Sequence, residues 1–364
     1  MRIAQIAPLA EAVPPKRYGG TERVVSYLTE ELVRQGHDVT LFASGDSRTS
    51  ARLVSCCPTA LRLDESVKDP VPHTLMMLDR VRQHSDEFDV LHFHTELEHF
   101  PVFQDIAERT VTTLHGRLDA NELNPFYERF SQFPLVSISN DQRQPMPPVN
   151  WVGTVYHGLP LELLEPSAYA DGGYLAFLGR IAPEKRPDRA IEIAKKAGIP
   201  LRIAAKVDDQ DRDYFEGHIR PLLDDSRVEF VDEIGEAAKG KFLGQARALL
   251  FPIDWPEPFG LVMIEAMACG TPIIAYPEGA VPEIIEKETG FLVTDTDEAV
   301  EAVKRVGELD RKAIRARFEE RFSARRMARD YVEIYRRLIA GTRLERRDGT
   351  GADSLAPVSV ARDR

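Results

Sequence analysis

The sequence contains little of what marks a secreted, membrane-spanning or metal-organised protein. Only Cys56, Cys57 and Cys269 are cysteines among its 364 residues, and their spacing fits neither a disulfide framework nor a zinc site. No apolar run reaches the roughly 18 residues of a membrane span. The N-terminus has no basic segment followed by a long apolar stretch. We therefore expect no transmembrane segment, no secretory signal and a cytoplasmic location.

Acidic residues outnumber basic ones, with 59 Asp and Glu against 47 Lys and Arg. The formal net charge is −12, which argues against nucleic acid as a partner because such a surface needs a basic field. A local basic patch, and with it contact with a membrane surface, stays open. A hydrophobic content of 43% with 29% charged residues is typical of a globular protein. The length suits two domains of about 150 residues each.

Short β-branched runs alternate with amphipathic segments along the chain, which predicts parallel α/β units. Between the first two runs, residues 21–36 place apolar side chains at helical spacing and end at a glycine. Strands are predicted at 2–9, 38–44, 89–94, 110–116, 134–139, 151–158, 174–179, 200–206, 227–232, 248–253, 272–277 and 290–293. The predicted fold is two doubly wound, Rossmann-like domains that face a central cleft.

The predicted division follows the interruptions of this alternation. Residues 1–160 form the first domain and 173–322 the second, joined by a proline- and glycine-containing hinge near 160–172. A helix over 323–342 closes the fold, and 343–364, which lacks periodicity, is predicted to be a disordered tail.

The most informative motif is EPFGLVMIE at 257–265. Pro258 and Gly260 supply a turn before a helix, whose N-terminus suits an anion. Glu257 and Glu265 could each accept hydrogen bonds from hydroxyls, on a sugar and on a ribose. The alternative is that both are solvated charges at a helix end.

Two loops carry further candidate residues. Arg180 and Lys185 follow a strand of the second domain and are suited to a diphosphate, although a plain surface loop is the alternative. In YGGTE at 18–22, Gly19 and Gly20 precede Thr21, which we expect to cap the first helix so that backbone donors face a phosphate. This loop is not a dinucleotide-binding fingerprint.

Histidines gather at strand ends of the first domain. His115 stands beside a glycine at the end of a predicted strand, where it could contact substrate or be structural. His92 and His94 project from one strand face and could in principle hold zinc. No further ligand is fixed by spacing, and we predict no metal site and no cofactor.

Together these motifs resemble glycosyltransferase family 4. The resemblance rests on Gly19-Gly20, His115, the pair Arg180 and Lys185, the segment 257–272, and PE at 282–283 followed by GFLV at 290–293. It covers about residues 1–340. Departures occur at His157, Lys206 and Asp232, where the family more often has Asn or Gly.

The resemblance implies a GT-B fold and a retaining transfer of sugar from a nucleotide-diphosphate donor to an acceptor that the sequence does not name. It implies that Arg180 and Lys185 meet the diphosphate, Glu257 the sugar hydroxyls and Glu265 the ribose. His115 would touch the sugar from the other domain, and the amides of Phe259, Gly260 and Leu261 would add donors. The donor is expected to be a uridine diphosphate sugar, and the acceptor a sugar or other small molecule.

Two other classes compete with this interpretation. Another GT-B enzyme, such as a sugar-nucleotide epimerase or a phosphorylase, would share the fold and some phosphate contacts. A two-lobed binding protein would have no need of Arg180, Lys185 and Glu257. No carboxylate of the first domain stands out as a nucleophile, although Asp119 is a candidate, and front-face substitution is favoured for that reason.

Overall fold

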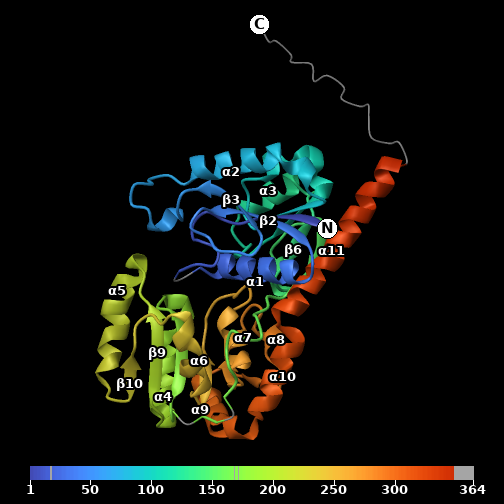
Figure 1. Cartoon of the computed structure of the whole chain (residues 1–364). Helices are drawn as coiled ribbons and strands as arrows, with labels where there is room; N and C mark the ends of the chain where they lie inside the picture. Colours follow the sequence, from blue (N-terminus) through green and yellow to red (C-terminus); the bar gives the residue numbers. More distant parts are fainter. Residues whose placement is uncertain (17–18, 168, 171, 348–364) are drawn as a thin grey trace.

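The computed structural model describes residues 1–16, 19–167, 169–170 and 172–347. They form two α/β domains stacked one above the other, with the N-terminal domain uppermost in Figure 1. The parallel strands of each sheet are covered by helices on both faces, so most strand residues are buried.

The N-terminal sheet has seven strands in the order β3-β2-β1-β4-β5-β6-β7, and every pair is parallel. Its strands are β1 (Arg2–Ile6), β2 (Asp38–Ser44), β3 (Arg52–Cys57), β4 (Val90–Phe93), β5 (Thr110–Thr113), β6 (Leu135–Ser137) and β7 (Trp151–Thr154). Its helices are α1 (Gly20–Arg34), α2 (Val71–Gln83) and α3 (Leu123–Arg129). Helix α1 buries Val24, Val25, Leu28 and Leu32 on one side, as its apolar spacing predicts.

The C-terminal sheet has six parallel strands in the order β10-β9-β8-β11-β12-β13. Its strands are β8 (Leu175–Arg180), β9 (Leu201–Lys206), β10 (Val228–Phe230), β11 (Ala248–Phe251), β12 (Ile273–Ala275) and β13 (Gly290–Leu292). The helices are α4 (Pro187–Ala197), α5 (Arg212–Tyr214), α6 (Glu236–Gly244), α7 (Leu261–Ala268), α8 (Val281–Ile284), α9 (Thr296–Arg305), α10 (Arg311–Arg321) and α11 (Ala324–Arg347). The predicted fold class is confirmed by these two sheets.

Three local predictions are wrong. Strand β3 is absent from the predicted strands, because it is a short edge strand whose residues are mostly exposed or partly buried and form no long apolar run. Helix α1 begins at Gly20 with Gly19 as its N-cap and without a side-chain cap, so Thr21 is not the cap. Residues 343–347 of the predicted tail are helical, because α11 continues to Arg347. The remainder of that tail, 348–364, lies outside the described residues.

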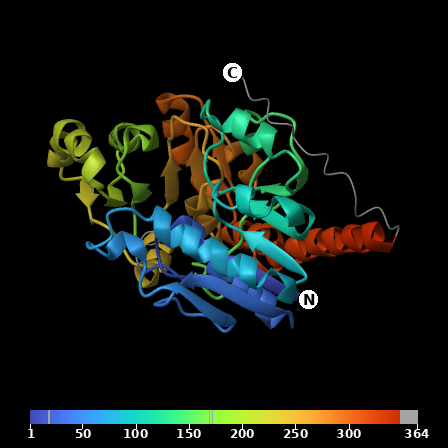
Figure 2. The ribbon, with the colours of Figure 1, turned by 90° about the horizontal axis from the view of Figure 1, so that it is seen from above.

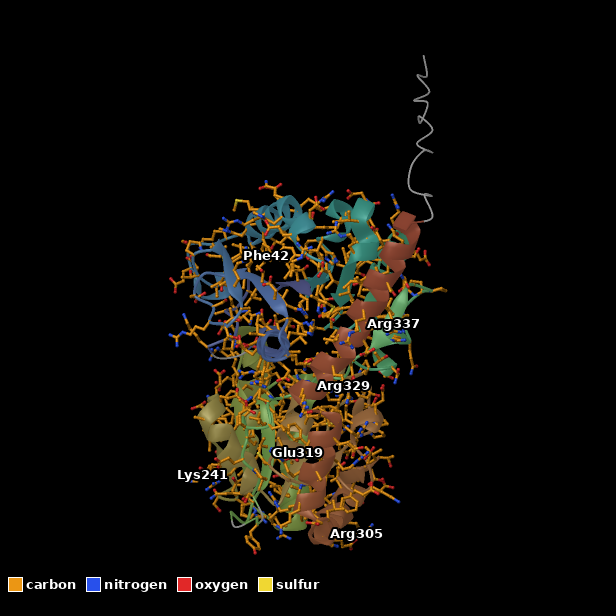
Figure 3. The ribbon with its side chains drawn as sticks, turned by 45° about the vertical axis from the view of Figure 1, so that its right-hand side comes forward. Phe42, Lys241, Arg305, Glu319, Arg329 and Arg337 are labelled. Carbon is orange, nitrogen blue, oxygen red and sulfur yellow. The ribbon has the colours of Figure 1, made fainter. Side chains whose placement is uncertain are left out.

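Helix α11 joins the two domains. It leaves the C-terminal domain after α10 and runs upward beside the N-terminal domain (Figure 1). In Figure 3, Glu319 of α10 lies beside the lower domain, and Arg329 and Arg337 follow along α11 toward the upper one. Seen from above, α11 lies at the side where the N-terminal strand begins (Figure 2). Tyr331 and Tyr335 are fully buried there.

The chain crosses between the domains twice, and the two crossings touch. The amide of Leu159 donates to the carbonyl of Phe322 at 2.8 Å, and the amide of Ala324 donates to the carbonyl of Leu159 at 2.8 Å. A Cβ at Gly158 would lie 2.4 Å from the carbonyl oxygen of Ser323. Only glycine therefore fits at the contact. The domain boundaries at 160, 173 and 323 stay a prediction.

None of the helices in the described part of the chain is both long and apolar enough to cross a bilayer.

Candidate functional site

Both sheets reverse their strand order beside their first strand, and these reversals face the same cleft. The chain builds outward from β1 to β2 and β3, then returns to β4 on the other side, and β8 stands in the same way between β9 and β11. Such switch points are where open parallel sheets bind ligands, beyond the carboxyl ends of their strands. A cleft of about 1950 Å³ lies there. It is lined by all ten predicted site residues: Gly19, Gly20, His115, Arg180, Lys185, Glu257, Phe259, Gly260, Leu261 and Glu265.

Lys185 and Glu257 form an ion pair in this cleft. Lys185 ends a short turn (Pro183–Lys185) after β8 and Glu257 follows β11, so two neighbouring strand ends bring them together. The ammonium Nζ of Lys185 bonds to Oε2 of Glu257. The indole Nε1 of Trp255 donates to the same oxygen at 2.9 Å, and Nζ lies 4.4 Å from the centre of the indole ring. A ligand that needs either charge must therefore share or break this pair.

Arg180 is also paired, with carboxylates from its own loop and from the loop after β9. Its guanidinium donates to Glu184 at 2.7 Å and to Asp211 at 2.7 Å, and Asp208 lies at 4.0 Å. The predicted cation therefore stands at the strand end where a diphosphate would be expected, but its charge is largely compensated by the protein.

Two helix N-termini lie on opposite sides of the cleft. Helix α7 begins after Gly260, whose φ of 83° is in the left-handed region that favours glycine. A Cβ built at Gly20, the first residue of α1, would lie 3.8 Å from the Leu261 side chain at the start of α7. Both termini have positive dipole ends and first-turn amides without an intrahelical partner, although the Glu22 carboxyl at the start of α1 already accepts from its own amide. Their approach makes a suitable binding site for an anion.

Glu265, one turn into α7, is 4% exposed and accepts a hydrogen bond from Lys239 of α6 at 2.6 Å. Beside it, Glu236 of α6 forms an ion pair with Arg23 of α1. These pairs link α1 to α6 and α7, so the two domains contact each other at this side of the cleft.

His115 follows β5 on the opposite wall. Its ring stacks on that of His157 at 5.3 Å, and its Nε2 lies 2.9 Å from Nδ1 of His94. Burial lowers the pKa of His115 to about 3, so the ring is neutral near pH 7. It can therefore act as a hydrogen-bond partner but not as a cation.

Glu96, His157 and Trp255 are among the residues that line the cleft without having been predicted as site residues. Oε1 of Glu96 accepts from the backbone amides of His115 at 3.3 Å and Gly116 at 3.2 Å, and burial raises the pKa of this carboxyl. Its position just after β4 was a usable signal. Asp119, the carboxylate chosen instead, pairs with Arg117 and is not among the lining residues.

Within the described residues, no group of three or more His, Cys, Asp or Glu side chains is arranged to hold a metal ion. His92 and His94 direct their ring nitrogens to protein partners.

Two family models match the chain, one for each domain. "Glycosyltransferase Family 4" matches residues 18–140, and "Glycosyl transferases group 1" matches residues 165–323. The chain belongs to glycosyltransferase family 4. The resemblance noted from its motifs is thereby confirmed.

Relatives in this family include D-inositol 3-phosphate glycosyltransferases. That of Saccharomonospora viridis is 31% identical over 228 residues, which is 53% of this chain and 52% of the relative. That of Rhodococcus erythropolis is 31% identical over 209 residues, 50% of this chain and 44% of the relative. The chain thus spans about half the length of these relatives, or less.

Solved structures share the GT-B fold over nearly the whole chain. AviGT4, a glycosyltransferase involved in avilamycin A biosynthesis, aligns with a TM-score of 0.70 at 22% identity, covering 93% of this chain and 98% of that one. Sucrose-phosphate synthase from Thermosynechococcus elongatus gives 0.75 at 20% identity, covering 93% and 99%. Anabaena HepE in complex with UDP-glucose gives 0.66 at 18% identity, covering 95% and 100%. The predicted GT-B fold is confirmed.

Proposed function

We propose that this chain is a retaining glycosyltransferase that transfers a sugar from a nucleotide-diphosphate donor, a uridine diphosphate sugar, to a small-molecule acceptor. The observation that carries the proposal is the convergence in one cleft of the Lys185–Glu257 pair and the N-termini of α1 and α7. Cations and oriented amides fit a diphosphate, and a carboxylate fits sugar hydroxyls.

The donor would lie mainly against the C-terminal domain. Lys185, Arg180 and the first amides of α7 would hold the diphosphate and stabilise the charge that develops on it as the glycosidic bond breaks. Glu257 would accept hydrogen bonds from the transferred sugar, and Glu265, deeper on α7, from the ribose. His115 would touch the sugar from the N-terminal wall.

Retention would follow front-face substitution, in which the departing phosphate helps to deprotonate the acceptor hydroxyl. The alternative is a covalent intermediate on a carboxylate, and Glu96 is a carboxylate in the same wall as His115. Its Oε1 already accepts from two backbone amides, which makes that oxygen a weaker nucleophile.

D-inositol 3-phosphate is the first acceptor to test, because the relatives in the family carry it in their name. On the N-terminal side the cleft is lined by Lys16 and Arg62, cations that suit a phosphorylated acceptor. Both already share their charge with a carboxylate, Lys16 with Asp46 at 3.0 Å and Arg62 with Glu11 at 3.2 Å.

The decisive experiment combines binding and product analysis. UDP and UDP-sugars should raise the melting temperature, because a ligand that binds only the folded state stabilises it by mass action. Proton NMR of the product from an α-linked donor should show an α-linked sugar. The absence of a melting shift with any uridine or guanosine diphosphate at millimolar concentration would remove the donor assignment, and a β-linked product would remove retention. Parallel assays with and without EDTA would measure metal dependence.

A further inference from the structure

A chain of buried hydrogen bonds leads from helix α11 to His115. The Tyr335 hydroxyl lies 3.2 Å from Nε2 of Gln5, the residue next to the end of β1. Oε1 of Gln5 lies 2.8 Å from Nε2 of His94, and Nδ1 of His94 lies 2.9 Å from Nε2 of His115. Tyr335, Gln5 and His94 are at most 2% exposed. Water is therefore not available to satisfy them in place of these partners.

The amide of Gln5 sets the direction of this chain of hydrogen bonds. An amide nitrogen donates, whereas an amide oxygen only accepts. Nε2 lies 3.2 Å from the Tyr335 hydroxyl and 3.4 Å from Nδ1 of His92, and those two atoms also bond to each other at 2.7 Å. If the amide were reversed, its nitrogen would donate to Nε2 of His94, and His94 would donate from Nδ1 to Nε2 of His115. The hydrogen of the His115 ring would then sit on Nδ1, a buried N–H without a partner, which is costly. The orientation with Oε1 toward His94 is favoured for this reason.

The orientation of Gln5 then determines which nitrogen carries the hydrogen in the rings of His94 and His115. Because Oε1 of Gln5 can only accept, Nε2 of His94 carries the hydrogen, and in the neutral ring its Nδ1 is an acceptor. That Nδ1 can pair only with a protonated Nε2 of His115. Nδ1 of His115 is consequently an unprotonated acceptor, and it is buried with no hydrogen-bond partner among the described residues.

The backbone around His115 adds to this polarity. The amides of His115 and Gly116, which could otherwise donate to a ligand, both donate to Glu96. This part of the wall holds a carboxylate and an imidazole lone pair. His115 lines the cleft, but its Nδ1 is itself buried, so a hydroxyl reaches this lone pair when neighbouring side chains move aside. The carboxylate and the lone pair both accept hydrogen bonds, so they fit a ligand that donates and repel an anionic oxygen.

We propose that Gln5 and His94 are positioning residues that hold His115 in the Nε2–H tautomer, so that its Nδ1 accepts from a hydroxyl of the bound sugar. The wall then selects neutral, hydroxyl-bearing sugars over those that carry a carboxylate or phosphate at this position. This inference rests on the proposed function for the identity of the ligand, whereas the tautomer does not depend on it.

The tautomer is measured directly on the full chain by long-range proton–nitrogen correlation NMR of ¹⁵N-histidine-labelled protein. The signals of His115 are assigned by their loss in His115→Gln. We expect a protonated Nε2 and an unprotonated Nδ1. A protonated Nδ1 in the wild-type chain overturns the proposal, whatever the activity.

Three variants then test the positioning role. His94→Leu removes the acceptor for Nε2 of His115, whereas in His94→Asn the amide oxygen, bonded to Cγ as Nδ1 is, can still accept. His99→Leu is the matched control, because His99 is as deeply buried and bonds to Thr112 at 2.8 Å, yet does not line the cleft.

We expect His94→Leu to lower kcat/KM for the donor sugar about tenfold, the effect of one lost hydrogen bond. His94→Asn should recover most of that loss, and His99→Leu should match the wild type. UDP affinity should be unchanged in all three, because UDP lacks the transferred sugar. Folding of each variant is checked by circular dichroism.

The outcomes separate this inference from the proposed function. A wild-type chain with the Nε2–H tautomer but no transfer from any nucleotide sugar refutes the function and leaves the hydrogen-bond chain intact. An active wild type in which His94→Leu behaves like His99→Leu refutes the positioning role. Rescue by His94→Asn together with the Nε2–H tautomer supports it.

Discussion

Replacing Glu257 by Gln should tighten the binding of UDP while it lowers turnover. The carboxylate of Glu257 holds the Lys185 ammonium, and a diphosphate would compete for the same cation. Gln keeps the shape and the hydrogen-bonding oxygen but removes the charge. Lys185 would then be free to pair with the diphosphate, and the transferred sugar would lose its charged acceptor.

The size of the effect follows from the burial of the pair. Its side chains are 18% and 12% exposed, so the pairing is stronger than at a surface but still reached by solvent. Releasing it should improve UDP binding by about 1 kcal/mol, or about fivefold in Kd. Lys185→Ala should weaken UDP binding by about 1.5 to 3 kcal/mol, the range for a hydrogen bond to a charged group. Turnover of Glu257→Gln should fall about 10-fold to 100-fold.

Calorimetry with UDP on the wild type, the two single variants and the double variant measures the coupling between the two residues. Turnover is followed by released UDP. Glu229→Gln serves as the control, because Glu229 pairs with Arg202 through exposed side chains and does not line the cleft. It should change neither quantity.

Weaker UDP binding in Glu257→Gln would refute this reasoning, since it would mean that the carboxylate supports the diphosphate site instead of competing with it. Additive effects in the double variant would likewise show that the pair does not matter to binding.

Three further changes have definite expected results. Burial lowers the pKa of His99 to about 3, so between about pH 6.5 and pH 3 the unfolded chain takes up a proton that the folded chain does not, and stability falls as the pH is lowered. His99→Gln should make this loss of stability with pH shallower by up to about 1.4 kcal/mol per pH unit, as measured by denaturant titrations. An equal slope in the variant and the wild type would contradict this. Gly158→Ala should destabilise the chain by about 1 to 3 kcal/mol, because its Cβ would meet the Ser323 carbonyl oxygen at 2.4 Å. An unchanged melting temperature would show that the two segments that cross between the domains move apart without cost. Glu96→Gln should lower turnover less than tenfold under front-face substitution, because its amide oxygen can still accept from the same backbone amides; loss of activity with recovery by azide would favour a covalent intermediate.

Much of the fold could be read from the sequence because it depends on local periodicity. The alternation of apolar runs with amphipathic segments fixed two parallel sheets, and parallel sheets gather the residues that follow their strands at one edge. That is why Gly20, His115, Lys185 and Glu257, placed only as strand-end residues, all line one cleft. Strand β3 was not predicted, because it is held in the sheet by pairing with β2 and has no long apolar run of its own.

What the side chains do in the cleft was decided by the tertiary structure. The sequence predicted cations and carboxylates as separate contacts for a ligand, whereas packing pairs Lys185 with Glu257, 72 positions away. Gln5 gave no signal at all, since its role requires Tyr335, 330 positions along the chain, to be carried back by α11. Hydrogen bonds and ion pairs act over a few ångströms and depend on orientation, so only the order of strands in the sheets and the docking of α11 determine which of these groups meet.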